Sequence, residues 1–127
     1  MKTSRGLGPP SSCETTEHAR RATRREPNRS TLETAAQMFE AAGNPQRLAL
    51  LILLRDGALS VAQMAARTGR HPSLVSQHLG ILRAARLVKA ARHGRFMVYE
   101  LFDRHAHTFV ESAVTLAGRI DRAAAAR

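Results

Sequence analysis

The most constraining feature of this chain is a pair of short helical segments joined by a turn that contains glycine. Ser60-Val61-Ala62-Gln63 has the spacing of a capping box, and the helix that it begins is expected to end at Gly69. Pro72 then stands at the first position of a second helix, which extends to about Ala84. The inner apolar stripe of this second helix is formed by Val75, Leu79 and Leu82. Two helices joined in this way predict a helix-turn-helix unit.

Two further helices are expected before this unit. Ser30 and Glu33 have capping-box spacing, so we predict a helix from Ser30 that ends before Gly43. Asn44 followed by Pro45 predicts the start of the next helix, which runs to about Asp56. The apolar stripe of the first of these helices consists of Leu32, Ala35, Ala36, Phe39 and Ala42.

After Leu87 the apolar period changes from helical to strand-like. The segments 87–91 and 96–101 flank Arg92-His93-Gly94-Arg95, which predicts a two-stranded hairpin with glycine in its turn. The predicted fold is therefore mainly α with a small β-hairpin. It is a winged helix-turn-helix of five helices and a two-stranded wing, with the fifth helix described next.

The last helix is expected to start at Asp103, an acidic N-cap. Its apolar stripe consists of Phe102, Ala106, Phe109, Val110, Ala113, Ala117 and Ile120. A terminal helix with so long a stripe needs a partner surface, which in a small domain is often the same helix of a second subunit. We therefore expect a homodimer that forms through its terminal helices, with packing on its own domain as the alternative.

Three parts are expected along the chain. Residues 1–29 predict a flexible basic arm, 30–122 the winged helix-turn-helix domain and 123–127 a frayed tail. The arm is either an unselective solvated tail or a segment that reads a nucleic-acid groove. The single cysteine, Cys13, cannot form an intramolecular disulfide, and a reducing cytoplasm fits this composition best.

The net charge of +10, from 20 Lys and Arg against 10 Asp and Glu, favours a polyanionic partner over an anionic membrane surface. The longest apolar run, 48–54, is too short to span a membrane, and the N-terminus has no apolar signal region. The stretch from Gly57 to Tyr99 contains seven basic residues and no Asp or Glu. A block of one sign across several elements predicts a surface that meets phosphate.

Small polar side chains on the outer side of the second helix of the unit can approach base edges closely, and the basic residues around them can contact phosphate. His78 lies beside the inner stripe, where capping or packing is an alternative to base contact. The residues expected to bind DNA are Arg70, Ser73, Leu74, Ser76, Gln77, His78, Arg83, Arg92, His93 and Arg95.

No enzyme is expected, because the chain has no glycine-rich phosphate loop, no HExxH motif and no Cys/His pair in a motif context. A general basic nucleic-acid-binding protein is the alternative to a sequence-specific regulator. It would account for the charge but not for the order of helix-turn-helix and wing.

In this order and spacing, three motifs resemble the ArsR/SmtB family of winged helix-turn-helix repressors. They are 42–48 (AGNPQRL), the run 75–88 that begins VSQHL and ends LV, and the wing residues 94–101, GRFMVYEL. The resemblance implies a cytoplasmic homodimer that binds a pseudo-palindromic double-stranded DNA operator. It also implies an effector that lowers the affinity for that operator.

The metal sites of the family are incomplete here. Soft-metal members carry CxC where this chain has Ser60 and Ala62, which cannot supply thiolates. Asp103 and His105 match the first half of the zinc, cobalt and nickel site, but its second half falls at Leu116 and Arg119. The other ligands would have to come from His107, Glu111, His18 or Cys13. The alternative is that Asp103 caps the helix and His105 is a surface residue.

Overall fold

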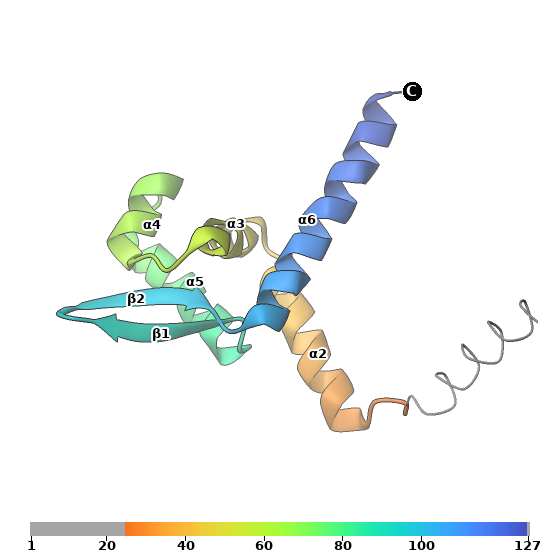
Figure 1. Ribbon diagram of the computed structural model, residues 1–127, viewed down its shortest axis with the longest axis horizontal. Helices are drawn as coiled ribbons and strands as arrows, with labels where there is room; N and C mark the ends of the chain where they lie inside the picture. The colour runs from red at the N-terminus through yellow and green to blue at the C-terminus, as the bar shows by residue number, and fades with distance from the viewer. Residues whose placement is uncertain (1–24, 127) are drawn as a thin grey trace, which may run out of the picture. The chain divides into compact units, whose positions relative to one another are not determined.

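The computed structural model describes residues 25–126, and the packing discussed below is that of residues 33–126. The described elements match the predicted winged helix-turn-helix, with five helices and one hairpin (Figure 1). Their order is α2 (Arg29–Ala42), α3 (Pro45–Leu53), the short 3-10 helix η1 (Leu54–Asp56), α4 (Val61–Thr68), α5 (Pro72–Ala84), β1 (Val88–His93), β2 (Phe96–Leu101) and α6 (Arg104–Ala125).

The predicted start of α3 and the predicted ends of α4 are confirmed. The Asn44 side chain accepts the backbone N–H groups of Gln46 and Arg47 at the start of α3. Ser60 and Gln63 form the reciprocal capping box at the start of α4. Gly69 ends α4 in the left-handed region at φ 68°, which glycine adopts without a steric penalty. The turn that aims α5 is thus defined by local sequence.

The predicted capping box at the start of α2 is wrong. The side chain of Asn28 accepts the backbone N–H of Thr31 at 2.8 Å, and Ser30 lies inside the helix. Asn is as good an N-cap as Ser, and nothing in Arg29 or Ser30 opposes helix, so the earlier cap prevails. At the other end of the domain, α6 continues to Ala125, whereas the sequence predicted a tail from residue 123.

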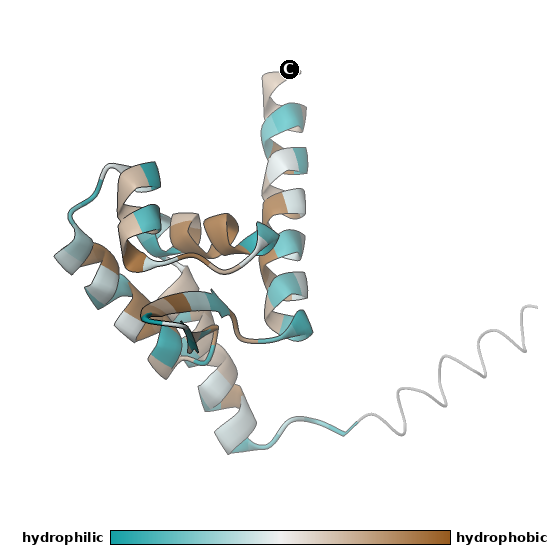
Figure 2. Ribbon diagram, turned by 60° about the vertical axis from the view of Figure 1, so that its left-hand side comes forward, coloured by the Kyte–Doolittle hydropathy of each residue, from teal (hydrophilic) through white to brown (hydrophobic). Residues whose placement is uncertain are grey.

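The core forms around α3, the most hydrophobic of the helices (Figure 2). The fully buried side chains include Leu51, Met64, Leu79, Leu82 and Leu87. Among the described residues, no polar or charged residue is buried. The predicted inner stripe of α5 is confirmed, since Val75 is buried beside Leu79 and Leu82. Burial of these side chains fixes α5 against α3 and α4, which leaves the opposite side of α5 free.

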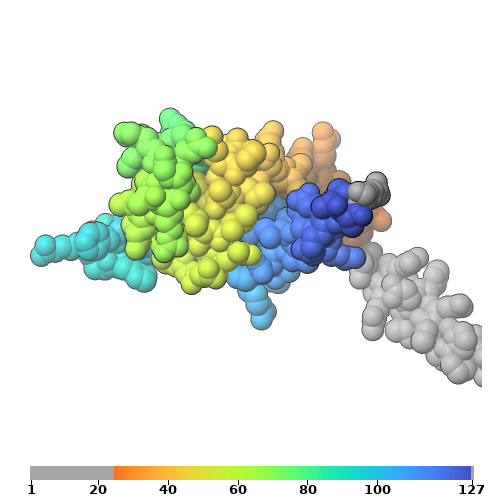
Figure 3. All heavy atoms as spheres, turned by 90° about the horizontal axis from the view of Figure 1, so that it is seen from above, coloured from red at the N-terminus to blue at the C-terminus, as the bar shows by residue number. Residues whose placement is uncertain are grey.

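The wing is an antiparallel hairpin that projects away from the helices (Figures 1 and 3). Its two-residue turn starts with Gly94 at φ 65°, between the paired residues His93 and Phe96. A positive φ at this position is what a tight hairpin turn requires. The sequence did not predict that Leu59 pairs with Tyr99, exchanging hydrogen bonds of 3.0 and 2.8 Å. This bridge ties the segment before α4 to the base of the wing.

No helix in residues 25–126 is long and apolar enough to cross a membrane.

Candidate nucleic-acid interface

The exposed side of α5 presents short polar side chains. Its N-terminus is capped by His71, whose Nδ1 accepts the backbone N–H of Ser73 at 3.0 Å. Ser73, Ser76 and Gln77 are exposed, and Leu74 is half-buried beside them. These side chains carry hydroxyl and amide groups that can hydrogen-bond base edges, and they are short enough for a duplex to approach the helix closely.

Gly80 extends this side of α5 by one turn and was missed in the sequence interpretation. It is exposed, and a Cβ built there would meet no atom within 4 Å. Glycine inside a helix costs about 1 kcal/mol relative to alanine. No contact within the described chain explains it. The sequence signal for this residue was a glycine that follows Ser73, Ser76 and Gln77 on the same exposed side of the predicted helix.

His78 differs from the other residues predicted to bind DNA. It is half-buried, and its Nε2 lies 2.9 Å from Oε1 of Gln46 on α3. Burial lowers the pKa of His78 below its ordinary value of 6.5, and the nearby charges of Arg47 and Arg70 lower it further. The imidazole is therefore neutral near pH 7. Its hydrogen bond joins α5 to α3, which corresponds to the packing alternative for this residue.

Basic side chains surround the polar side of α5. All seven Lys and Arg residues between Gly57 and Tyr99 are exposed, and no acidic residue lies in that stretch. Arg70 lies in the turn before α5, Arg83 at its end, and Arg92, His93 and Arg95 at the tip of the wing. Such a field attracts the phosphates of a nucleic acid without selecting a sequence.

Two cations that the sequence interpretation did not select, Arg86 and Lys89, join Arg83 in a groove between α5 and β1 of about 590 Å³. Arg86 is the one non-glycine residue of 25–126 with a positive φ, at 61°. A left-handed residue with a Cβ carries strain, and glycine is the usual residue after a helix end. The acid-free block already contained both cations, but their position beside Arg83 depends on how the chain turns from α5 into the wing.

Asp103 and His105, the predicted half of a metal site, lie at the start of α6. Oδ1 of Asp103 accepts the backbone N–H groups of His105 and Ala106 at 2.9 and 3.0 Å, so Asp103 caps the helix. The His105 side chain is exposed. Within residues 25–126, no three His, Cys, Asp or Glu side chains gather as metal ligands would. These residues alone therefore do not fit a closed zinc site, which needs four ligands. Cys13 and His18 lie outside the described residues.

Apolar side chains of α2 and α6 remain exposed, unlike the core stripe of α5. Phe39, Leu116 and Ile120 are 65, 57 and 59% exposed. Phe39 packs edge-to-face on Phe109 of α6, with ring centroids 5.1 Å apart, so one edge of the pair is open to solvent. Ala106 and Val110 are buried in the core, whereas Ala113, Ala117 and Ile120 of the same predicted stripe are exposed. The second half of α6 thus presents an apolar strip that its own domain does not cover.

The helix-turn-helix, the hairpin and the exposed cations define a winged helix-turn-helix DNA-binding domain. The comparison with protein families identifies the same unit, because residues 44–90 match the family described as "Bacterial regulatory protein, arsR family". The chain belongs to the ArsR family of transcriptional regulators.

Relatives in mycobacteria support this assignment. The chain is 37% identical over 92 residues to the HTH-type transcriptional repressor SmtB of Mycobacterium tuberculosis. The aligned region covers 72% of this chain and 68% of that relative. It is 38% identical over 79 residues to the HTH-type transcriptional regulator NmtR of the same species, covering 62% of this chain and 66% of that one.

Solved structures show the same fold. The homodimeric winged helix-turn-helix domain of a possible ArsR-family regulator from Mycobacterium bovis superposes with a TM-score of 0.69, at 26% identity, over 76% of this chain and 90% of that one. HlyU from Vibrio cholerae superposes with a TM-score of 0.65, at 28% identity, over 70% and 97% of the two chains.

Proposed function

We propose that this chain is a homodimeric, sequence-specific repressor that binds an operator in duplex DNA and acts in the cytoplasm. Exposed polar side chains on α5 surrounded by cations in an acid-free stretch are the observation that carries the proposal. Ser73, Ser76, Gln77 and Leu74 contact base edges in the major groove. Arg70, Arg83, Arg92, His93 and Arg95 contact phosphates. His78 holds α5 in place through Gln46.

The dimer forms through α6 together with the second half of α2. The exposed Phe39, Leu116 and Ile120 supply an apolar surface on these two helices. A two-fold axis places two copies of α5 on successive turns of the major groove, so the operator is an inverted repeat. The neighbour from Mycobacterium bovis with the same winged helix-turn-helix fold is a homodimer, which supports a dimer here.

Selection of bound duplexes from a random pool, followed by competition, tests this function. We expect an inverted repeat to be enriched and to bind at least a thousandfold more tightly than random duplex at the same salt concentration. Equal competition by random duplex or structured RNA would support the alternative, a general basic nucleic-acid-binding protein.

We further propose that an effector releases the repressor from its operator. Zinc, cobalt and nickel are tested first, by titration against operator affinity in the wild type and in His105→Ala. A metal response that His105→Ala abolishes would assign Asp103 and His105 to the site. If none of the three metals changes operator affinity, the effector is not one of them.

A further inference from the structure

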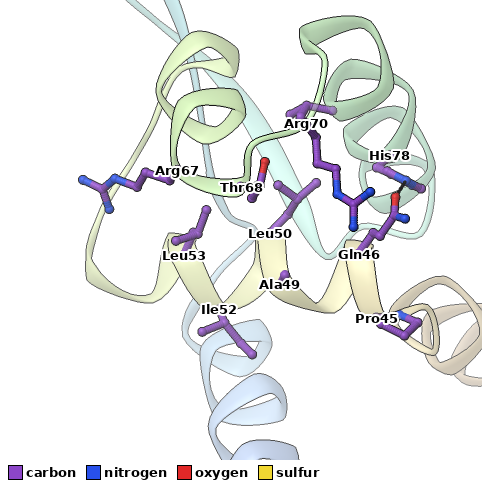
Figure 4. A pocket seen from close by; sticks show the side chains of 11 residues that line it. Pro45, Gln46, Ala49, Leu50, Ile52, Leu53, Arg67, Thr68, Arg70 and His78 are labelled. Atoms are coloured by element: carbon purple, nitrogen blue, oxygen red, sulfur yellow. Dashed lines mark hydrogen bonds between the residues drawn. The ribbon is translucent and has the colours of Figure 1, made fainter.

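A groove of about 460 Å³ opens between α3, α4 and the first half of α5 (Figure 4). This volume lies within the range of small-molecule sites. Its floor and walls include Leu50 and Val75 of the core, with Ala49, Ile52 and Leu53 along α3. Leu50 and Val75 are buried, while Ala49 is exposed, so the apolar lining reaches the surface. An apolar chain could therefore enter the groove without displacing the core.

The rim of this groove is cationic. Arg67 at the end of α4 and Arg70 in the following turn both line it, and both are exposed. No lining residue is acidic. Figure 4 shows the guanidinium of Arg70 pointing across the groove toward Gln46 and His78. An apolar groove with arginines at its mouth is complementary to a molecule with an apolar body and one anionic end.

One wall holds a polar group that lacks a partner. His78 uses Nε2 for Gln46, but its Nδ1 is buried and has no hydrogen-bond partner in the described part of the chain. A buried polar atom without a partner is uncommon, and it can be satisfied by a bound molecule. Because Nε2 donates to the amide oxygen of Gln46, Nδ1 of the neutral ring is a hydrogen-bond acceptor and does not bind an anion. The cation at this polar end of the groove is Arg70, whereas the guanidinium of Arg67 points the other way (Figure 4).

We propose that the groove binds an amphiphilic monoanion, a carboxylate with an unbranched apolar tail, and that this ligand regulates DNA binding. The tail lies on Leu50, Leu53 and Val75, and the carboxylate lies against the guanidinium of Arg70. The regulatory part rests on the proposed function, because it assumes that α5 reads DNA.

The coupling follows from the position of the groove. Val75 and His78 line it from the same helix that carries Ser76 and Gln77 on its other side. Arg70 is shared, because it lines the groove and also belongs to the surface expected to meet phosphate. A ligand that holds Arg70 over the groove removes a cation from DNA. Binding of the carboxylate and of the duplex is therefore mutually unfavourable.

Direct binding to the full-length protein without DNA is the first test, with hexanoate, octanoate and decanoate as probes. Because burial of a CH₂ group contributes about 0.8 kcal/mol, affinity should rise about threefold to fourfold for each added CH₂. Decanol has the tail but no charge, and decyltrimethylammonium has the opposite charge. We expect decanoate to bind more tightly than decanol, and the cation not to bind. Equal affinity of decanoate and decanol would overturn the anion site.

Three variants locate the site. Ala49→Phe fills the groove from α3 and should weaken decanoate binding by at least tenfold, whereas Ala62→Phe, on an exposed position of α4 outside the lining, should leave it unchanged. Arg70→Gln should weaken decanoate binding at least threefold and leave decanol binding unaffected. Decanoate binding that survives Ala49→Phe would place the ligand elsewhere and overturn the proposal.

The chain's own N-terminal segment is the competing occupant. A spin label on Cys13, the single cysteine, would broaden the NMR signals of Leu50 and Val75 if residues near Cys13 filled the groove. Broadening that decanoate does not relieve would overturn the proposal.

Operator titration is the last arm. Saturating decanoate should lower the operator affinity of the wild type about fivefold, as expected for loss of one exposed charge contact, and leave that of Ala49→Phe unchanged. If decanoate binds but DNA affinity does not move, the regulatory part is wrong and the binding site stands. If the protein binds no duplex at all, the proposed function fails, whereas the binding results stay interpretable on their own.

Discussion

The guanidinium of Arg55 and the carboxylate of Glu111 meet across the domain, with Nη1 and Oε1 2.6 Å apart although the residues are 56 positions apart in sequence. His107, one turn before Glu111, places Nε2 3.3 Å from the backbone carbonyl oxygen of Arg55. Arg55 lies in η1, directly after α3. Glu111 thus contacts the side chain of Arg55 and His107 contacts its backbone. These contacts connect α6 to the helix-turn-helix core.

The Arg55–Glu111 pair should contribute a small, salt-sensitive coupling. The two side chains are 33 and 45% exposed, and exposed pairs contribute about 0.2–1 kcal/mol. A double-mutant cycle with Arg55→Gln and Glu111→Gln, measured by urea denaturation, should give a coupling in that range that shrinks in high salt. Asp121→Asn removes a charge from the same helix and should not couple to Arg55. A coupling free energy of zero at low salt would show that Arg55 and Glu111 do not interact in solution.

Gly80→Ala should stabilise the fold and weaken DNA binding together. The new Cβ meets nothing within 4 Å, so the gain in helix propensity, about 1 kcal/mol, is retained. The same methyl group stands on the side of α5 that approaches the duplex, where it keeps the helix away from the bases. Urea denaturation and fluorescence anisotropy with the selected operator measure the two effects.

Gly118→Ala is the matched control for this helix substitution. A Cβ at Gly118 on α6 meets only the guanidinium end of Arg122, at 3.4 Å. This variant should gain stability without losing operator affinity. Unchanged operator affinity in Gly80→Ala would show that no duplex approaches that part of α5.

Base contacts and phosphate contacts should separate by their salt dependence. Gln77→Ala should lower operator affinity by about 1–3 kcal/mol and leave affinity for random duplex almost unchanged. Arg95→Ala should weaken both and reduce the slope of log affinity against log salt by about one. Anisotropy titrations at several salt concentrations distinguish the two patterns. If Gln77→Ala lowers the affinity for operator and for random duplex equally, the Gln77 side chain does not contact bases.

The fold was predictable wherever a local signal fixes an element. Caps at Asn44 and Ser60, and glycines at 69 and 94, define helix ends and the wing turn through interactions over a few residues. The start of α2 was misplaced because Asn28 and Ser30 are equally good caps by type. The bridge between Leu59 and Tyr99 was not predictable, since no local pattern encodes a pairing of one residue across 40 positions.

The exposed polar and cationic surface of the candidate site was predictable in character but not in every residue. Acid-free composition revealed the cationic surface, and helical periodicity separated Val75 from Ser76. The role of His78 depended on which side chain of α3 lies opposite, and only the packing brings Gln46 within 2.9 Å of it. The Arg55 contacts to His107 and Glu111 depended in the same way on how α6 crosses η1.

Ile120→Glu should dissociate the proposed dimer. Ile120 is 59% exposed in one chain, and a two-fold interface would receive the new carboxylate twice. Burial of two unpaired charges against an apolar strip is unfavourable, so the dissociation constant should rise at least a hundredfold. Sedimentation equilibrium measures it. Thr108→Glu adds the same charge at an exposed position of α6 and should remain dimeric. A dimeric Ile120→Glu would place the interface elsewhere.

Protonation of His78 should destabilise the fold at acidic pH. Burial, Arg47 and Arg70 lower its folded-state pKa below 6.5, so the folded state favours the neutral ring. The unfolded state therefore binds more protons between the two pKa values. This contribution to stability is complete above about pH 6.5, the unfolded-state pKa, and is lost as pH falls through the lower, folded-state pKa. The glutamine in His78→Gln does not titrate, so this variant lacks the pH-dependent contribution of His78 to stability. Urea midpoints of wild type and His78→Gln, measured from pH 7.5 to 5 at one protein concentration, give the difference that isolates His78 from the other histidines. The wild type should lose more stability than the variant as pH falls, and parallel curves would show that the His78 ring titrates as it does in the unfolded chain.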